Sequence, residues 1–69
     1  MRENLIRARK KARLTQKEIS QKIGITERHY KSLEAGTSDG SVRVWQRLKE
    51  ITGESIDYLL EQENNPKEV

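Results

Sequence analysis

The sequence predicts an all-α fold, a compact bundle of five short helices in one domain of 69 residues. Apolar residues recur at the three-to-four residue spacing of a helix face in five successive segments. A hydroxyl side chain precedes four of these segments and a glycine follows three, which are residue types that begin and end helices. Strand signals are weak, because strict alternation and long β-branched runs are absent from the sequence.

The first helix is predicted over residues 2–12, with the apolar positions Leu5, Ile6, Ala8 and Ala12. A capping-box sequence, TQKE at 15–18, then opens the second helix, because its hydroxyl and its glutamate satisfy free backbone N–H groups. Ile19 and Ile23 face inward in this helix. Gly24 follows its last apolar residue, where a left-handed backbone commonly ends a helix.

The third helix begins at once, with Thr26 as its predicted N-cap. Tyr30 and Leu33 face inward, Gly36 ends the helix, and a turn-rich loop follows at 37–40. Two short helices joined by a tight glycine-containing turn form a helix-turn-helix, in which the second helix stands out from the bundle. The major groove of B-DNA admits one α-helix, and polar residues in its first turn reach the base edges.

The fourth helix is capped by Ser41 and stopped by Gly53, and its predicted inward residues are Val42, Trp45, Leu48 and Ile51. Ser55 caps a short fifth helix that carries Ile56, Leu59 and Leu60. We therefore expect the helix-turn-helix domain to span residues 1–60. The polar residues 61–69 are predicted to be a disordered tail.

Several classes of function are disfavoured by composition. The chain has no cysteine, so disulfides, thiolate metal sites and cysteine nucleophiles are excluded. A single histidine, His29, cannot form a multi-histidine metal site. No apolar run approaches membrane-spanning length, and no nucleophile–base motif or phosphate-binding glycine loop is present. We expect no enzyme activity, no metal or other cofactor, no small-molecule substrate and no membrane partner.

Charge is distributed unevenly along the chain. Residues 1–37 carry ten Lys or Arg and four Asp or Glu, a net charge of +6, whereas residues 38–69 carry four and seven, a net charge of −3. A basic half joined to an acidic half is typical of a protein with a polyanion-facing surface. High charge also keeps small domains in solution, and charge alone does not separate these two interpretations.

Residues 4–60 resemble the Cro and phage-repressor type of helix-turn-helix domain, also called the Xre type. The matching stretches are LTQKEISQKIGITERHYKSLEAG at 14–36 and SVRVWQRLKEITGESIDYLL at 41–60. The resemblance implies a lambda-repressor-like DNA-binding fold in a cytoplasmic, sequence-specific regulator. The expected function is that of a Cro-like repressor that binds a palindromic double-stranded DNA operator as a homodimer, in which the dimer is weak or forms only on DNA. The alternative is an antitoxin-like or anti-repressor-like protein-interaction module with little sequence-specific DNA binding.

Site residues follow from the resemblance position by position. The base-reading positions are Thr26, Glu27, Arg28 and Ser32. The residues expected to contact phosphate or to set position are Arg9, Lys10, Gln16, Lys17, Lys31 and Arg43. Arg9 is also expected to pair with Glu34, which ties the first helix to the third and holds the arginine near the DNA backbone.

Some roles stay open from the sequence. Arg28 is favoured as a guanine contact over a phosphate contact, whereas Glu27 equally fits a cytosine contact or a stabilising acid at a helix N-terminus. Trp45 is expected in the core. Tyr58 and Leu60 are favoured as a dimer surface over additional core, although polar residues elsewhere in the last two helices depart from the family pattern and weaken that expectation.

Overall fold

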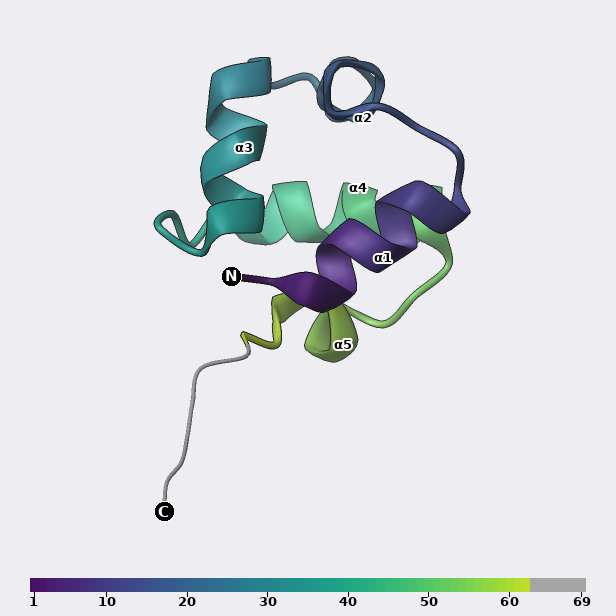
Figure 1. The fold of residues 1–69 in the computed structure, drawn as a ribbon, viewed down its shortest axis with the longest axis vertical. Coiled ribbons are helices and arrows are strands. Elements are labelled where there is room, and N and C mark those ends of the chain that lie inside the picture. Colours follow the sequence, from purple (N-terminus) through teal and green to yellow (C-terminus); the bar gives the residue numbers. More distant parts are fainter. Residues whose placement is uncertain (63–69) are drawn as a thin grey trace.

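A computed structural model describes residues 1–62 and contains five helices, α1 to α5 (Figure 1). Their bounds are Glu3–Lys11, Gln16–Ile23, Glu27–Ala35, Val42–Thr52 and Ile56–Leu60. The predicted all-α fold is confirmed over this range, in which no residue lies in a strand. Most of the predicted tail falls on residues 63–69, which lie outside the described residues, so that prediction stays untested.

The helices enclose one small core between them. In Figure 1, α3 stands along one side of the molecule, α2 is seen end-on above the others, and α1 and α4 cross the middle. The last helix, α5, lies below α1 and packs against both α1 and α4. The buried apolar side chains are Leu5, Ala8, Ile19, Tyr30, Leu33, Val44, Trp45, Leu48 and Leu59. Trp45 is in the core as predicted, and its indole N–H donates to the Asp39 carbonyl at 2.7 Å.

Local capping explains where the helices begin and end. The Thr15 hydroxyl accepts a hydrogen bond from the Glu18 N–H, and the Glu18 carboxylate accepts one from the Thr15 N–H, so the predicted capping box is complete. The other predicted hydroxyl caps, at Thr26, Ser41 and Ser55, each accept from the N–H three residues on. The helix-ending glycines are all left-handed, at Gly24, Gly36 and Gly53.

One inward position was predicted wrongly. Val42 is 72% exposed, and Val44 is buried in its place. Successive helix residues are about 100° apart, so the face that carries Val44 and Leu48 points away from Val42. Leu60, for which a surface position was favoured over the core, is 37% exposed, while Leu59 is buried, because the five-residue α5 turns only one side toward the core.

A buried arginine near the N-terminus was not foreseen. Arg2 is 3% exposed, and its guanidinium donates to the carbonyls of Leu33, Ser38 and Leu60 at 2.8, 2.8 and 3.2 Å. It also lies 5.1 Å from the ring centroid of Trp45. Leu33 and Leu60 lie in the last turns of α3 and α5, where carbonyls carry partial negative charge. Arg2 thus holds the end of the third helix, the following loop and the end of α5 together.

Arg13, in the connection between α1 and α2, has a backbone φ of +61°. Residues with a Cβ atom are disfavoured in this left-handed region, and Gly is not. Arg13→Gly is therefore expected to raise the free energy of unfolding by about 0.5–1 kcal/mol. Urea unfolding followed by Trp45 fluorescence measures the change, because Trp45 is the only tryptophan and is buried.

The matched control places the same kind of substitution inside a helix. Lys11→Gly, in the last turn of α1, should instead lower the free energy of unfolding by roughly 0.5–1 kcal/mol. A loss of stability in Arg13→Gly equal to that in Lys11→Gly would contradict the assignment of backbone strain to position 13.

Candidate nucleic-acid interface

The turn between α2 and α3 is built by the three residues that separate them. Gly24 has a φ of +92°, and its N–H and that of Ile25 both donate to the Ser20 carbonyl, at 2.9 and 3.0 Å. Ile25 is half-buried and packs against the core. Thr26 then caps α3 through the His29 N–H. These contacts stop one helix and start the next in a new direction, so that the two helices cross steeply in Figure 1.

The third helix turns one side to the core and the other to solvent. Its buried residues are Tyr30, Leu33 and Glu34. Arg28, His29 and Lys31 are exposed, while Glu27 and Ser32 are half-buried. The helix therefore shows a long polar face beginning at its first turn. This is the arrangement that a helix needs if it is to lie in a groove.

The four base-reading candidates differ in how much of their polar surface is unoccupied. Arg28 is exposed and makes no side-chain hydrogen bond or ion pair with any residue in the range 1–62. The Thr26 hydroxyl accepts from the His29 N–H at 3.0 Å, and the Ser32 hydroxyl donates to the His29 carbonyl at 2.6 Å. Glu27 lies 3.7 Å from Lys31 one turn on. Arg28 is thus the candidate with its full hydrogen-bonding capacity available.

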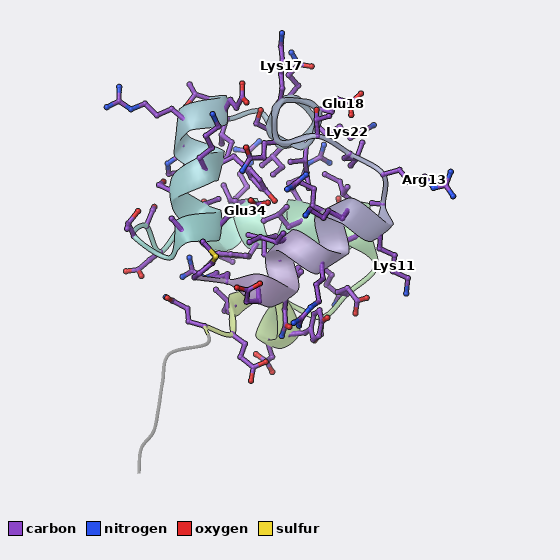
Figure 2. The ribbon with its side chains drawn as sticks, in the orientation of Figure 1. Lys11, Arg13, Lys17, Glu18, Lys22 and Glu34 are labelled. Carbon is purple, nitrogen blue, oxygen red and sulfur yellow. The ribbon has the colours of Figure 1, made fainter. Side chains whose placement is uncertain are left out.

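The phosphate candidates are spread over several elements. Lys10, Lys17, Lys31 and Arg43 are exposed, whereas Arg9 and Gln16 are half-buried. Figure 2 shows Lys17 pointing outward from α2, away from the body of the molecule. In the same view, Lys11 and Arg13 extend from the end of α1 on the side away from α3.

Arg43 lies beside the turn of the helix-turn-helix. It lines a shallow hollow with residues 23–25 of the turn and with Val44 and Arg47 of α4. The Arg47 guanidinium donates to the Lys22 carbonyl at 3.0 Å and lies 3.3 Å from the Glu50 carboxylate. Arg47 therefore ties α4 to the last turn of α2. This contact could not be predicted from the sequence, because it joins residues 25 positions apart.

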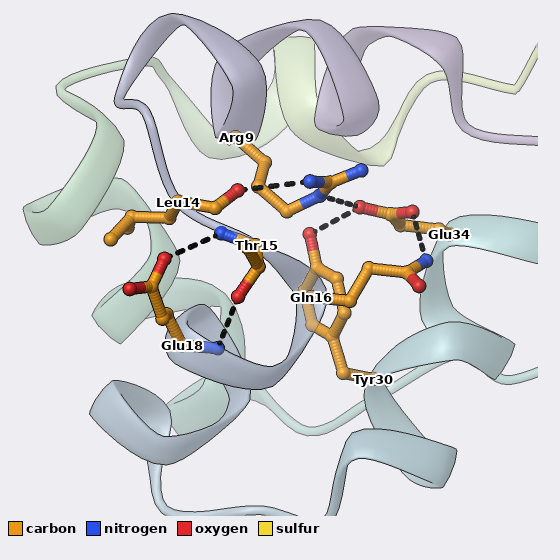
Figure 3. A network of polar contacts seen from close by, with 7 residues as sticks. All are labelled: Arg9, Leu14, Thr15, Gln16, Glu18, Tyr30 and Glu34. Atoms are coloured by element: carbon orange, nitrogen blue, oxygen red, sulfur yellow. Dashed lines mark hydrogen bonds and ion pairs between the residues drawn. The ribbon is translucent and has the colours of Figure 1, made fainter.

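A buried carboxylate joins the first three helices behind the polar face (Figure 3). Glu34 is 4% exposed, and its Oε2 accepts from Arg9 Nε at 2.7 Å and from the Tyr30 hydroxyl at 2.6 Å. Its Oε1 accepts from Gln16 Nε2 at 2.9 Å. The expected Arg9–Glu34 ion pair is therefore present. Arg9 Nη1 also donates to the Leu14 carbonyl at 2.9 Å, which fixes the connection between α1 and α2.

Tyr30 has a role beyond filling the core. Burial, and then the hydrogen bond and charge of the Glu34 carboxylate, raise the pKa of Tyr30 far above its ordinary value of 10.0. The hydroxyl therefore stays protonated and donates to Glu34 across the range in which proteins are normally handled. The sequence placed Tyr30 correctly inside the fold, but nothing in the helical spacing indicated that its hydroxyl would join an ion pair.

No group of three or more His, Asp or Glu side chains within residues 1–62 is placed to hold a metal ion. No helix in that part of the chain has the length and apolar character required to cross a membrane.

Comparisons with known proteins give a consistent result. The chain matches a protein-family model described as Helix-turn-helix over residues 5–59. It is 37% identical over 65 residues to YqaE, an uncharacterized HTH-type transcriptional regulator of Bacillus subtilis (strain 168). That alignment covers 94% of this chain but 56% of YqaE, so the chain spans little more than half the length of this relative. No solved structure matches the chain significantly.

Proposed function

The chain belongs to the Cro-type, or Xre-type, helix-turn-helix family of DNA-binding transcriptional regulators, and from this premise we propose that it is a small Cro-like repressor. In this proposal it occupies a palindromic operator in the cytoplasm as a homodimer and blocks transcription. The mechanism is binding without chemistry. The observation that supports it best is the exposed polar face of α3, on which Arg28 has no partner within residues 1–62.

Arg28 is the proposed reader of sequence. It is the second residue of α3, so it lies in the turn that enters the major groove first in this kind of domain. A guanidinium makes two parallel hydrogen bonds to guanine O6 and N7, which discriminates against other bases by about 1–3 kcal/mol. Because Arg28 has no competing ion pair in the described part of the chain, no internal contact is lost when it binds.

The lysines on the same side are the proposed anchors. Lys17 extends from the first turn of α2, and Lys31 lies one turn after Glu27 on α3. Phosphate contacts set the register of a protein on DNA and supply most of its salt-dependent affinity, but they carry no direct sequence information. Lys10 and Arg43, both exposed, complete the proposed set of backbone contacts with Arg9 and Gln16.

The proposed dimer surface is on α5. Tyr58 and Leu60 are 36% and 37% exposed, although both are large apolar residues. A domain of this size contacts only one half-site, and linking two half-sites increases affinity without new base contacts. A weak dimer that is completed on a palindromic operator fits a surface this small.

Two alanine substitutions separate reader from anchor. Arg28→Ala should relax base preference at one position in each half-site, with a loss of about 5- to 150-fold on the preferred sequence. Lys17→Ala should weaken binding to all sequences alike and reduce the slope of log affinity against log salt by about one unit. Both effects are measured by titrating each variant with the preferred site and with its single-base variants at several salt concentrations.

Lys11→Ala is the matched control. Its side chain extends away from α2 and α3, so affinity and salt slope should stay within about twofold of wild type. Equal, uniform losses in Arg28→Ala and Lys17→Ala would contradict the division into reader and anchor. Binding that none of the three variants changes would favour the alternative, a protein-interaction module.

A further inference from the structure

We infer that Tyr30 and Glu34 are positioning residues that fix the orientation of the Gln16 side-chain amide at the edge of the DNA-binding surface. The inference deepens the proposed function and rests on it. In this inference the amide NH₂ and carbonyl oxygen of Gln16 each point in one fixed direction toward DNA. A hydrogen-bond network sets these directions in the free protein (Figure 3).

The two oxygens of Glu34 have different partners. Oε2 accepts from Arg9 Nε and from the Tyr30 hydroxyl, at 2.7 and 2.6 Å. Oε1 is left for Gln16 Nε2, at 2.9 Å. Tyr30 and Glu34 are four residues apart on α3, so their side chains lie on the same face of the helix and the hydroxyl is within reach of the carboxylate. With two donors holding Oε2, the carboxylate is fixed so that Oε1 faces α2.

An ionised carboxylate accepts hydrogen bonds and donates none. Gln16 must therefore turn its NH₂ group, not its carbonyl oxygen, toward Glu34. A glutamine amide without such a partner can rotate by 180° and exchange donor for acceptor at the same place. The contact with Glu34 removes this freedom and leaves Gln16 with its Oε1 and one remaining N–H for a ligand.

The position of Gln16 makes this orientation relevant to DNA. It is the first residue of α2, it is half-buried, and it precedes Lys17, whose side chain extends outward from the same turn. The remaining N–H suits a phosphate oxygen, and an acceptor beside a donor also suits the N6 and N7 edge of adenine. Because the amide is already ordered, less side-chain freedom is lost on binding.

Tyr30 is the member of the network whose hydrogen bond can be removed without changing the charge of the protein. Tyr30→Phe removes the hydroxyl, keeps the ring in the core, and leaves the Arg9–Glu34 ion pair in place. Glu34 Oε2 then has one donor in place of two, and the carboxylate can turn away from Gln16. Tyr30 itself is buried, so an effect on DNA must pass through Glu34 and its other partners, Arg9 and Gln16. The double-mutant cycle below isolates the part that passes through Gln16.

The experiment is a double-mutant cycle on the DNA site selected by the wild-type protein. Affinities are measured for wild type, Gln16→Ala, Tyr30→Phe and the double variant, at a temperature where circular dichroism shows all four folded. Gln16→Ala should weaken binding about tenfold in the wild-type background but only about two- to threefold with Tyr30→Phe. Lys17→Ala is the control cycle and should cost the same in both backgrounds.

A second readout needs neither a variant nor DNA. In the free wild-type protein, one side-chain N–H proton of Gln16 should be shifted downfield from its position in a solvent-exposed glutamine and the other should not, because only one of them is bonded to Glu34. Shifts equal to those of a solvent-exposed glutamine would overturn the inference, as would equal effects of Gln16→Ala in both backgrounds. If the wild-type protein selects no DNA sequence, the proposed function fails and the inference fails with it.

Discussion

Replacing Glu34 with alanine is expected to lower the free energy of unfolding by about 3–5 kcal/mol. Glu34 is buried, and its carboxylate is the shared partner of Arg9, Gln16 and Tyr30. Without it, a largely buried guanidinium and a buried hydroxyl lose their acceptor. A domain of this length has a total stability of only about 3–10 kcal/mol, so a loss of this size removes a large fraction of it. Urea unfolding followed by Trp45 fluorescence measures the loss.

The matched control removes an exposed carboxylate. Glu50 pairs with Arg47 on α4 at 3.3 Å, but the two side chains are 67% and 50% exposed. Exposed pairs contribute little, so Glu50→Ala should change the free energy of unfolding by less than about 0.5 kcal/mol. A loss below about 1 kcal/mol in Glu34→Ala would show that the buried network does not hold the first three helices together.

Replacing Arg2 with methionine is expected to cost about 2–4 kcal/mol. Methionine keeps an apolar stem beside Trp45 but leaves the carbonyls of Leu33, Ser38 and Leu60 without the guanidinium donor. Two of these carbonyls lie in the last turns of helices, so the favourable interaction of a cation with a helix C-terminus is lost as well. Thermal unfolding by circular dichroism reports the effect as a lowered Tm.

Arg7→Met, on α1, is the control for this substitution. Arg7 is exposed and its guanidinium donates to the Asn4 side chain at 3.1 Å, so the expected change is within about 0.5 kcal/mol. Arg2→Lys keeps the charge but not the planar fork, and should fall between Arg2→Met and wild type. If Arg2→Met and Arg7→Met have the same Tm, Arg2 does not hold the ends of α3 and α5.

The helix starts and stops could be predicted because they depend on neighbouring residues. Thr15 and Glu18 form their capping box within one turn, and Gly24 needs only its own freedom of φ. The inward residues of α2 and α3 could also be predicted, because they follow the three-to-four residue spacing of a helix face. Val42 shows the limit of this reasoning, because two phases of the apolar pattern were possible on α4 and only packing chooses between them.

Long-range polar contacts could not be predicted. Arg2 is separated from Leu33, Ser38 and Leu60 by 31, 36 and 58 positions, and an arginine near the N-terminus ordinarily indicates a solvated residue. The Arg9–Glu34 pair was expected only through the family resemblance. The hydroxyl of Tyr30 and the amide of Gln16 complete that pair through the fold, and periodicity carries no information about hydrogen bonds across helices.

The residues proposed to read bases were predicted as a set, and the structure shows how their side chains differ. Thr26 and Ser32 use their hydroxyls within α3, and Glu27 lies near Lys31. Arg28 is exposed, without a side-chain partner in the range 1–62. The proposed DNA binding therefore depends mainly on Arg28 for reading and on the lysines for anchoring, with Gln16 proposed to be held in a fixed orientation.

The most direct test is a selection of random double-stranded DNA on the purified protein, followed by titration of the enriched site at several salt concentrations. We expect a palindromic consensus and an affinity that falls steeply with salt, because two half-sites each add phosphate contacts. No enriched sequence, with only weak and salt-sensitive binding, would contradict the proposed repressor and favour the protein-interaction module.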